Sequence, residues 1–88
     1  MILYPNPADG SQPLMILVPR GAASNVRVQI FTVAFRKVQD ETFINPPLGI
    51  PVAVNLKDKA GVPLASGLYY VVVTTDSGRF IGKLLILR

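Results

Sequence analysis

Short stretches of alternating apolar and polar residues, broken by turn-forming residues, constrain this chain more than any other feature. Between Val26 and Ile30, apolar residues alternate with Arg27 and Gln29, and the same period of two recurs at 52–56. Successive side chains of a β-strand point to opposite faces, whereas the side chains of a helix repeat about every 3.6 residues. The pattern therefore predicts strands with one buried face and little or no helix.

Prolines, glycines and small polar residues, including Pro19-Arg20-Gly21, divide the chain into strands predicted at residues 2–4, 14–18, 26–30, 36–42, 51–56, 68–75 and 79–87. The segment 68–75 is rich in β-branched and aromatic residues, which predicts a central strand buried on much of both faces. We expect Val28 and Val72 to lie in the core. Seven strands in 88 residues leave no room for crossover helices. The predicted fold class is therefore all-β, an Ig-like or fibronectin-III-like antiparallel β-sandwich.

Length and composition indicate a single domain, residues 1–88. Half of the residues are apolar and 16% are charged, which is typical of a globular chain rather than a disordered one. The chain has no cysteine, so its core has no disulfide to support it. Its apolar runs are far shorter than the ~20 residues of a transmembrane helix. Residues 1–3 run directly into the turn at 4–7 with no secretory signal pattern before it, so we expect a domain of a longer protein, and this says little about the compartment of that protein.

The charge balance favours a solvated surface over a nucleic-acid site. Nine Lys and Arg residues against five Asp and Glu residues give a net charge of +4, and the basic residues are scattered along the chain. Binding of nucleic acid usually shows as a clustered basic patch on a recognisable motif, and none is present in the sequence. We therefore expect no nucleic-acid partner, and attraction to anionic glycans or lipid head groups stays open.

The residue types needed for catalysis are largely missing. There is no His and no Cys, so the serines lack a histidine base. Asp40 and Glu41 are adjacent on a predicted strand, so their carboxylates point to opposite faces and cannot act as a pair. Asp9, Asp58 and Asp76 each stand alone in turns, where carboxylates commonly form the turn itself. We expect no catalytic residue, no metal site and no cofactor.

Three motifs frame the chain. Residues 4–7 read Tyr-Pro-Asn-Pro, in which two prolines fix φ and the Asn6 side chain can cap the turn. Residues 58–69 read Asp-Lys-Ala-Gly-Val-Pro-Leu-Ala-Ser-Gly-Leu-Tyr, with two glycines suited to positive φ. The hydroxyl of Tyr69 or Tyr70 is expected to bond to nearby backbone, as in a tyrosine corner. Residues 82–88 read Gly-Lys-Leu-Leu-Ile-Leu-Arg, so Lys83 and Arg88 bracket an apolar strand.

These motifs resemble those of C-terminal Ig-like domains of secreted bacterial proteins. The first and last are similar to the sorting domains of type IX secretion cargo, and residues 58–69 are similar to the Ig-like domains of flagellar hook-capping proteins. Phe35 stands where the family usually carries Gly, so we expect a different turn there, because Phe adopts positive φ only at a cost. Val54-Asn55 replaces the Trp-Asp of hook-capping relatives, which favours the sorting or accessory-domain identity.

The resemblance implies a non-catalytic sorting and anchoring domain of a secreted or cell-surface bacterial protein. Its implied partners are the upstream domain of the parent protein and the outer-membrane secretion machinery. Lys83 and Arg88 are the expected recognition residues. The alternative is a passive accessory domain of a surface enzyme, which packs against its neighbour or binds a surface glycan. Two or more exposed, coplanar aromatic rings on one sheet face would favour glycan binding.

Overall fold

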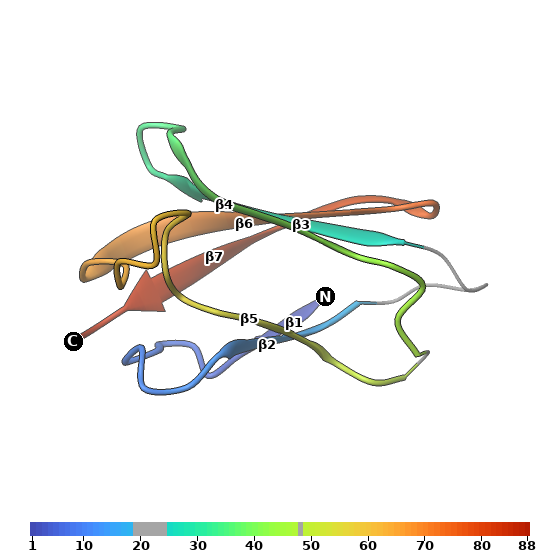
Figure 1. Cartoon of the computed structure of the whole chain (residues 1–88), viewed down its shortest axis with the longest axis horizontal. Helices are drawn as coiled ribbons and strands as arrows, with labels where there is room; N and C mark the ends of the chain where they lie inside the picture. The colour runs from blue at the N-terminus through green and yellow to red at the C-terminus, as the bar shows by residue number, and fades with distance from the viewer. Residues whose placement is uncertain (19–24, 48) are drawn as a thin grey trace.

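The computed structural model describes residues 1–18, 25–47 and 49–88, which form two antiparallel sheets packed face to face (Figure 1). The smaller sheet has the order β1-β2-β5, with β1 at Ile2–Tyr4, β2 at Leu14–Leu17 and β5 at Val52–Val54. The larger sheet has the order β4-β3-β6-β7, with β4 at Lys37–Phe43, β3 at Val26–Thr32, β6 at Gly67–Thr75 and β7 at Gly78–Ile86. The described residues contain no helix. The predicted seven-stranded sandwich is confirmed.

Most strand boundaries lie within a residue or two of the predicted ones. β5 is shorter than expected, because the chain leaves the sheet after Val54 and pairs with itself: the Leu64 amide donates to the Leu56 carbonyl at 3.0 Å. The predicted turn at Pro19-Arg20-Gly21 lies outside the described residues. No helix in the described part of the chain is long and apolar enough to cross a membrane.

The core lies between the two sheets and is made of alternate residues of each strand. Val28, Val71 and Val73 have no exposed surface. The expectation that Val72 is a core residue was wrong, because Val72 pairs with Gln29 on the outer face of the larger sheet and is only half-buried. An apolar run has no alternation to show which of its residues are buried. The register with β3 therefore decides which residues of β6 face the core. The outward side chains of Tyr70, Val72 and Thr74 on β6 are therefore partly exposed.

The turn between β3 and β4 contains a residue with positive φ that we did not expect there. Phe35 adopts φ 64°, the left-handed conformation that we expected this residue to avoid. Its amide donates to the Thr32 carbonyl at 2.8 Å, so a tight turn is followed by one left-handed residue, as in many hairpins. The Phe35 ring stacks on Tyr70 with centroids 5.6 Å apart. A stacked aromatic pair contributes about 0.5–1.5 kcal/mol, which offsets much of a left-handed penalty of about 1–2 kcal/mol.

Candidate functional site

The Pro-Asn-Pro segment at the start of the chain binds directly to the last strand. The Asn6 Nδ2 donates to the Lys83 carbonyl at 2.9 Å, and the Leu85 amide donates to the Asn6 Oδ1 at 3.1 Å. The expectation that Asn6 caps its own turn was therefore wrong. Its side-chain amide imitates a strand residue and pairs with the edge of β7, 77 and 79 residues further along the chain.

Backbone pairing continues this contact toward the C-terminus. The Ala8 amide donates to the Leu85 carbonyl, and the Leu87 amide donates to the Ala8 carbonyl, both at 2.8 Å. Ala8 is buried and forms a parallel bridge with Ile86. The second half of β7 is thus held on both edges, by β6 on one side and by residues 6–8 on the other. The Pro-Asn-Pro segment and the last strand therefore satisfy each other's hydrogen bonds.

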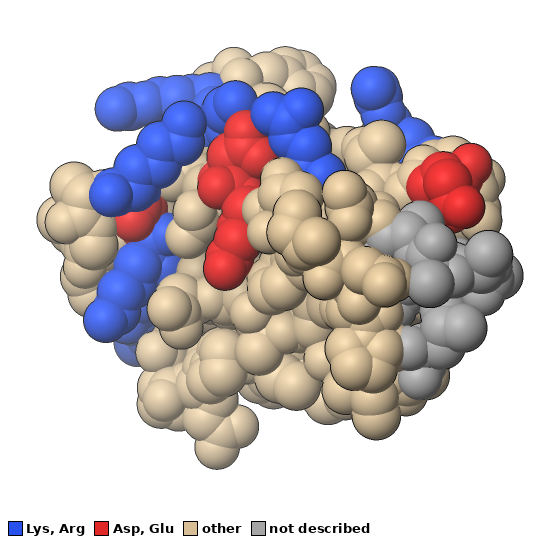
Figure 2. All heavy atoms as spheres, turned by 45° about the vertical axis from the view of Figure 1, so that its right-hand side comes forward, with Lys and Arg blue, Asp and Glu red and all other residues tan. Residues whose placement is uncertain are grey.

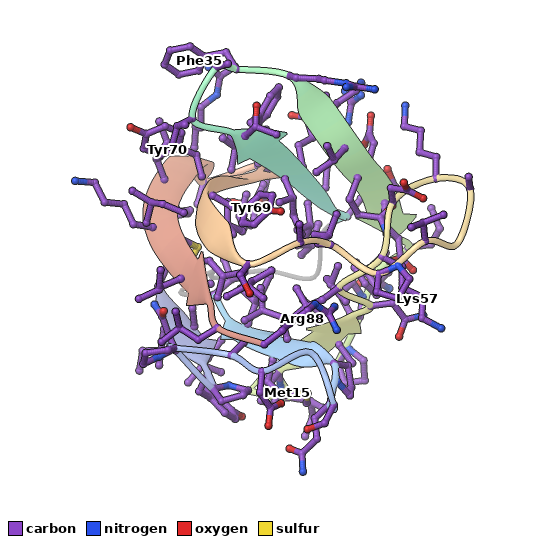
Figure 3. All side chains as sticks on the ribbon, turned by 90° about the vertical axis from the view of Figure 1, so that its left-hand side faces the viewer. Met15, Phe35, Lys57, Tyr69, Tyr70 and Arg88 are labelled. Carbon is purple, nitrogen blue, oxygen red and sulfur yellow. The ribbon has the colours of Figure 1, made fainter. Side chains whose placement is uncertain are left out.

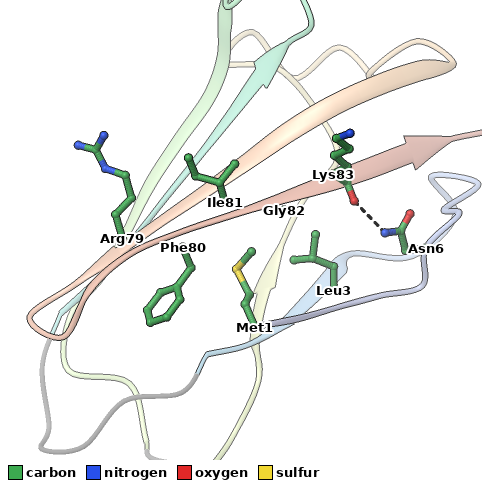
Figure 4. A pocket seen from close by; sticks show the side chains of 8 residues that line it. All are labelled: Met1, Leu3, Asn6, Arg79, Phe80, Ile81, Gly82 and Lys83. Carbon is green, nitrogen blue, oxygen red and sulfur yellow. Dashed lines mark hydrogen bonds between the residues drawn. The ribbon is translucent and has the colours of Figure 1, made fainter.

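Lys83 lies exposed on the outer face of the larger sheet, where it pairs across the ladder with Tyr70. In the described part of the chain its ammonium group forms no ion pair, and Figure 4 shows it pointing away from the β7 backbone. Its carbonyl accepts the bond from Asn6, so the strand is fixed at the residue that carries this cation. Of the two predicted recognition residues, Lys83 is the one whose side chain forms no hydrogen bond or ion pair among the described residues.

Arg88 is anchored more firmly than we expected. Its Nε donates to the Leu64 carbonyl, and its amide donates to the Ser66 Oγ at 2.9 Å. Figure 3 shows Arg88 just beyond the end of β7, beside the segment that leads into β6. A side chain at Gly10, where φ is +81°, would collide with the Arg88 guanidinium at 2.6 Å, so glycine makes room for it. Arg88 therefore joins the end of β7 to the 58–69 motif.

The 58–69 motif forms a rigid corner. Asp58 Oδ1 accepts the amides of Ala60 and Val62, both at 2.9 Å, and Gly61 adopts φ 84° as expected. The buried Tyr69 donates its hydroxyl to the Ala65 carbonyl at 2.7 Å, which confirms the predicted tyrosine corner. These bonds hold the segment that contains the Leu64 carbonyl and the Ser66 hydroxyl, the two groups to which Arg88 donates. The motif has a structural role that supports the end of β7.

The acidic residues are taken up by local contacts. Asp9 accepts both the amide and the hydroxyl of Ser11, and the side-chain bond from Ser11 lowers the pKa of its carboxyl. Asp40 pairs with Arg27 at 2.7 Å and with Lys37 at 3.0 Å. The hydrogen bond from Arg27 holds the pKa of the Asp40 carboxyl well below its usual range. Among the described residues, no three His, Cys, Asp or Glu gather as metal ligands.

Asp40 and Glu41 lie on opposite faces of β4, as expected. Asp40 pairs with Gln29 on the outer face, and Glu41 pairs with the buried Val28 on the other. Figure 2 shows cationic side chains around acidic ones on one face, beside a broad uncharged area. The two carboxylates are therefore not placed to act together in acid and base catalysis.

The outer face of the larger sheet also carries an aromatic pair. Phe35 is 74% exposed at the tip of the β3–β4 hairpin, where Figure 3 shows it, and its ring is parallel to that of Tyr70 within 8°. The two rings are stacked on each other, so they do not lie side by side as a flat platform. Ile81 and Val72 extend the apolar surface next to them. Sequence analysis did not identify this surface, because an apolar strand does not show in its sequence which of its aromatic residues face outward.

Comparisons with known proteins agree with this arrangement. The family described as "Secretion system C-terminal sorting domain" matches residues 2–87. Among solved structures, dimeric latent PorU from Porphyromonas gingivalis is similar, with a TM-score of 0.68 and 26% sequence identity. That match covers 98% of this chain and 9% of the PorU chain. No curated protein matches this chain. The chain belongs to the type IX secretion C-terminal sorting domains, which mark proteins as secreted or attached to the cell surface.

Proposed function

We propose that this domain is the export and anchoring signal at the C-terminal end of a longer bacterial protein, read in its folded state by the outer-membrane secretion machinery. The pairing of Asn6 and Ala8 with β7 is the observation that carries this proposal. It joins the two ends of the domain, which are far apart in sequence, into one surface. A receptor that contacts this surface distinguishes the folded domain from an unfolded chain.

Lys83 and Arg88 are the proposed recognition residues, with different contributions. Lys83 presents a cation that has no ion-pair partner in the described residues, which suits direct contact with an acidic group of the machinery. Arg88 has its Nε bonded to the Leu64 carbonyl, so it also sets the position of the strand end. We further propose that the domain, residues 1–88, packs beside an upstream domain of the parent protein and supplies no catalysis itself.

The test is delivery of a reporter fused to this domain in a bacterium with type IX secretion. We expect Lys83→Glu to leave the reporter in the periplasm, while the matched charge change Lys59→Glu, in the distant turn after Asp58, leaves surface delivery intact. Both purified variants should melt within a few degrees of the wild type, because exposed substitutions change stability by about 0.5 kcal/mol or less. Normal delivery of folded Lys83→Glu would remove this residue from the recognition surface.

Replacement of Arg88 can change stability as well as recognition, because Arg88 is bonded to Leu64 and Ser66, so two variants are compared. Arg88→Lys keeps the charge and loses the planar donor group, whereas Arg88→Gln loses the charge. If the charge is recognised, Arg88→Lys is delivered and Arg88→Gln is retained in the periplasm, with equal melting temperatures. If both variants melt lower and are delivered alike, Arg88 acts only in the fold.

One further candidate, glycan binding by an accessory domain, rests on the exposed ring of Phe35, because its stacking on Tyr70 leaves a single ring rather than a platform of two. The exposed face of Phe35 is open to a sugar ring, and Arg79 lies on the same surface. Titration of the purified domain with neutral and acidic oligosaccharides tests this, with Phe35→Ala as the binding-defective variant. Absence of any saturable, Phe35-dependent binding would end this candidate.

A further inference from the structure

Among the described residues, one edge of β7 is hydrogen-bonded along only half of its length. β6 pairs with β7 along its whole length, from Gly78 to Ile86, without a shift in register. On the opposite edge, every second residue points its backbone groups outward. Both groups of Leu85, the Leu87 amide and the Lys83 carbonyl are bonded to residues 6–8. By the same alternation, the amides and carbonyls of Arg79 and Ile81 and the amide of Lys83 point outward. In the described part of the chain, none of these groups has a backbone partner.

A groove runs beside this free edge. It is lined by Met1 and Leu3 from the other sheet, by Asn6, and by residues 79–83 of β7 (Figure 4). Gly82 faces inward and lies so close to Met1 and Leu3 that an added Cβ would be 2.9 and 3.0 Å from their side-chain carbons. Those two side chains thus form an apolar wall, and Asn6 marks the point at which the edge is already occupied.

The outer face of this edge has a distinct pattern of side chains. Arg79, Ile81 and Lys83 alternate outward as cation, apolar residue and cation, and Ile81 is 65% exposed. The ion pairs of the described residues involve Arg27, Lys37 and Asp40, so neither cation of this edge is neutralised there. Sheet edges are usually blunted by charge or covered, and an exposed apolar residue on an open edge invites another strand.

We propose that the free edge of β7 accepts an extended segment of a partner protein in which two acidic residues, four positions apart, flank three apolar residues. Directly opposed residues of paired strands share a face, so the two acids would lie beside Arg79 and Lys83 and the central apolar residue beside Ile81. The remaining two side chains would point inward onto Met1 and Leu3. Main-chain hydrogen bonds give such strand addition its affinity, and the alternate side chains give it specificity.

The charge pattern argues against a second copy of this chain as the occupant. The five acidic residues are Asp9, Asp40, Glu41, Asp58 and Asp76, and no two of them are four positions apart. Antiparallel pairing of two β7 edges would place Arg79 of one copy against Lys83 of the other, which is destabilising. The 88 residues of this chain therefore do not supply the complement to this edge. This inference rests on the proposed function only in taking the secretion machinery as the source of that segment.

Binding is tested with the purified 88-residue chain and a capped peptide, Ser-Asp-Val-Ile-Val-Glu-Ser, with a control peptide that carries Lys at both acidic positions. We expect saturable binding of the acidic peptide, at least tenfold weaker binding of the control, and slower amide exchange at Arg79, Ile81 and Lys83. Equal binding of the two peptides, or unchanged exchange at these amides, would overturn the proposal. Exchange protection on concentration of the domain alone, with dimers in sedimentation, would assign the edge to a second copy and also overturn it.

Ile81→Pro provides the mutational test. The Ile81 amide points outward, so proline removes a donor from the free edge without removing one from the β6 ladder. Ile81→Ala is the matched control, because it removes the same exposed side chain and keeps the amide. We expect peptide affinity to fall at least tenfold in Ile81→Pro and by much less in Ile81→Ala. Equal affinities for the two variants would contradict strand addition. If Ile81→Pro does not fold, the amide exchange of the wild type still decides the question.

The same variants separate this inference from the proposed function. Loss of peptide binding together with loss of reporter delivery in Ile81→Pro supports the secretion machinery as the source of the strand. Loss of peptide binding with normal delivery overturns that source and leaves the sorting role in place. Failure of the wild-type fusion to reach the surface contradicts the proposed function, while the peptide measurements still test the edge.

Discussion

Replacement of Asn6 gives the sharpest test of how the two ends of the domain are joined. Asn6→Ala removes two hydrogen bonds, to the Lys83 carbonyl and from the Leu85 amide, and leaves both backbone groups to water. A hydrogen bond contributes about 0.5–1.5 kcal/mol net, and these two are exposed, so we expect a loss of about 1–2 kcal/mol. For a domain of this size, that corresponds to a melting temperature lower by roughly 4–16 °C.

The assay is urea unfolding of the purified domain, followed by far-ultraviolet circular dichroism. A lower midpoint at constant slope reports a loss of stability rather than a change in the unfolded state. Asn6→Asp is the informative companion. Its carboxylate keeps the acceptor for Leu85 and loses the donor to Lys83, whereas the protonated acid can donate again. Its deficit relative to the wild type should therefore shrink as the pH falls from 7 to 3.

Two results would refute this reasoning. If Asn6→Ala unfolds at the same urea concentration as the wild type, residues 6–8 do not hold β7 in solution. If the Asn6→Asp deficit does not depend on pH, the side-chain amide does not act as a paired donor and acceptor. Tyr4→Phe, which changes a neighbouring side chain and leaves both bonds in place, serves as the control and should unfold with the wild type.

Three further predictions concern the core, the tyrosine corner and the outer-face ion pair. Val71→Ala should cost about 1–3 kcal/mol in unfolding free energy and Val72→Ala clearly less, because only the first is fully buried; equal losses would mean that the register is wrong. Tyr69→Phe should lower stability by about 0.5–1.5 kcal/mol, since the part-buried hydrogen bond to the Ala65 carbonyl is lost; an unchanged melting temperature would contradict this. The Arg27 bond lowers the folded pKa of Asp40 below its ordinary value of 3.8, so its stabilisation is present above that pH and is lost as the pH falls further. Acid titration of stability should therefore be shallower in Asp40→Asn, and parallel curves would exclude the pair.

Much of this fold follows from local patterns. Alternation at β3 and β5 identified the buried faces correctly, because a strand reverses its side chains at every residue whatever surrounds it. The positive φ at Gly61 and the bond of Tyr69 to backbone four residues earlier were also predictable, since both involve only neighbouring residues. The family and its sorting role were visible from motifs for the same reason. Each motif is contiguous in the sequence.

The arrangement of the candidate site required the tertiary structure. The sequence marked Lys83 and Arg88 as the ends of a strand, but the partners of Asn6 lie 77 and 79 residues away and those of Arg88 lie 22 and 24 residues away. An apolar run such as 70–73 does not reveal its inward face, and Phe35 keeps a costly φ beside Tyr70. Within residues 1–18, 25–47 and 49–88, the bonds of residues 6–8 to β7 leave the amides and carbonyls of Arg79 and Ile81 without a backbone partner. Periodicity predicts which side chains a strand buries, whereas only the packed chain decides which of its backbone groups remain free to bind another protein.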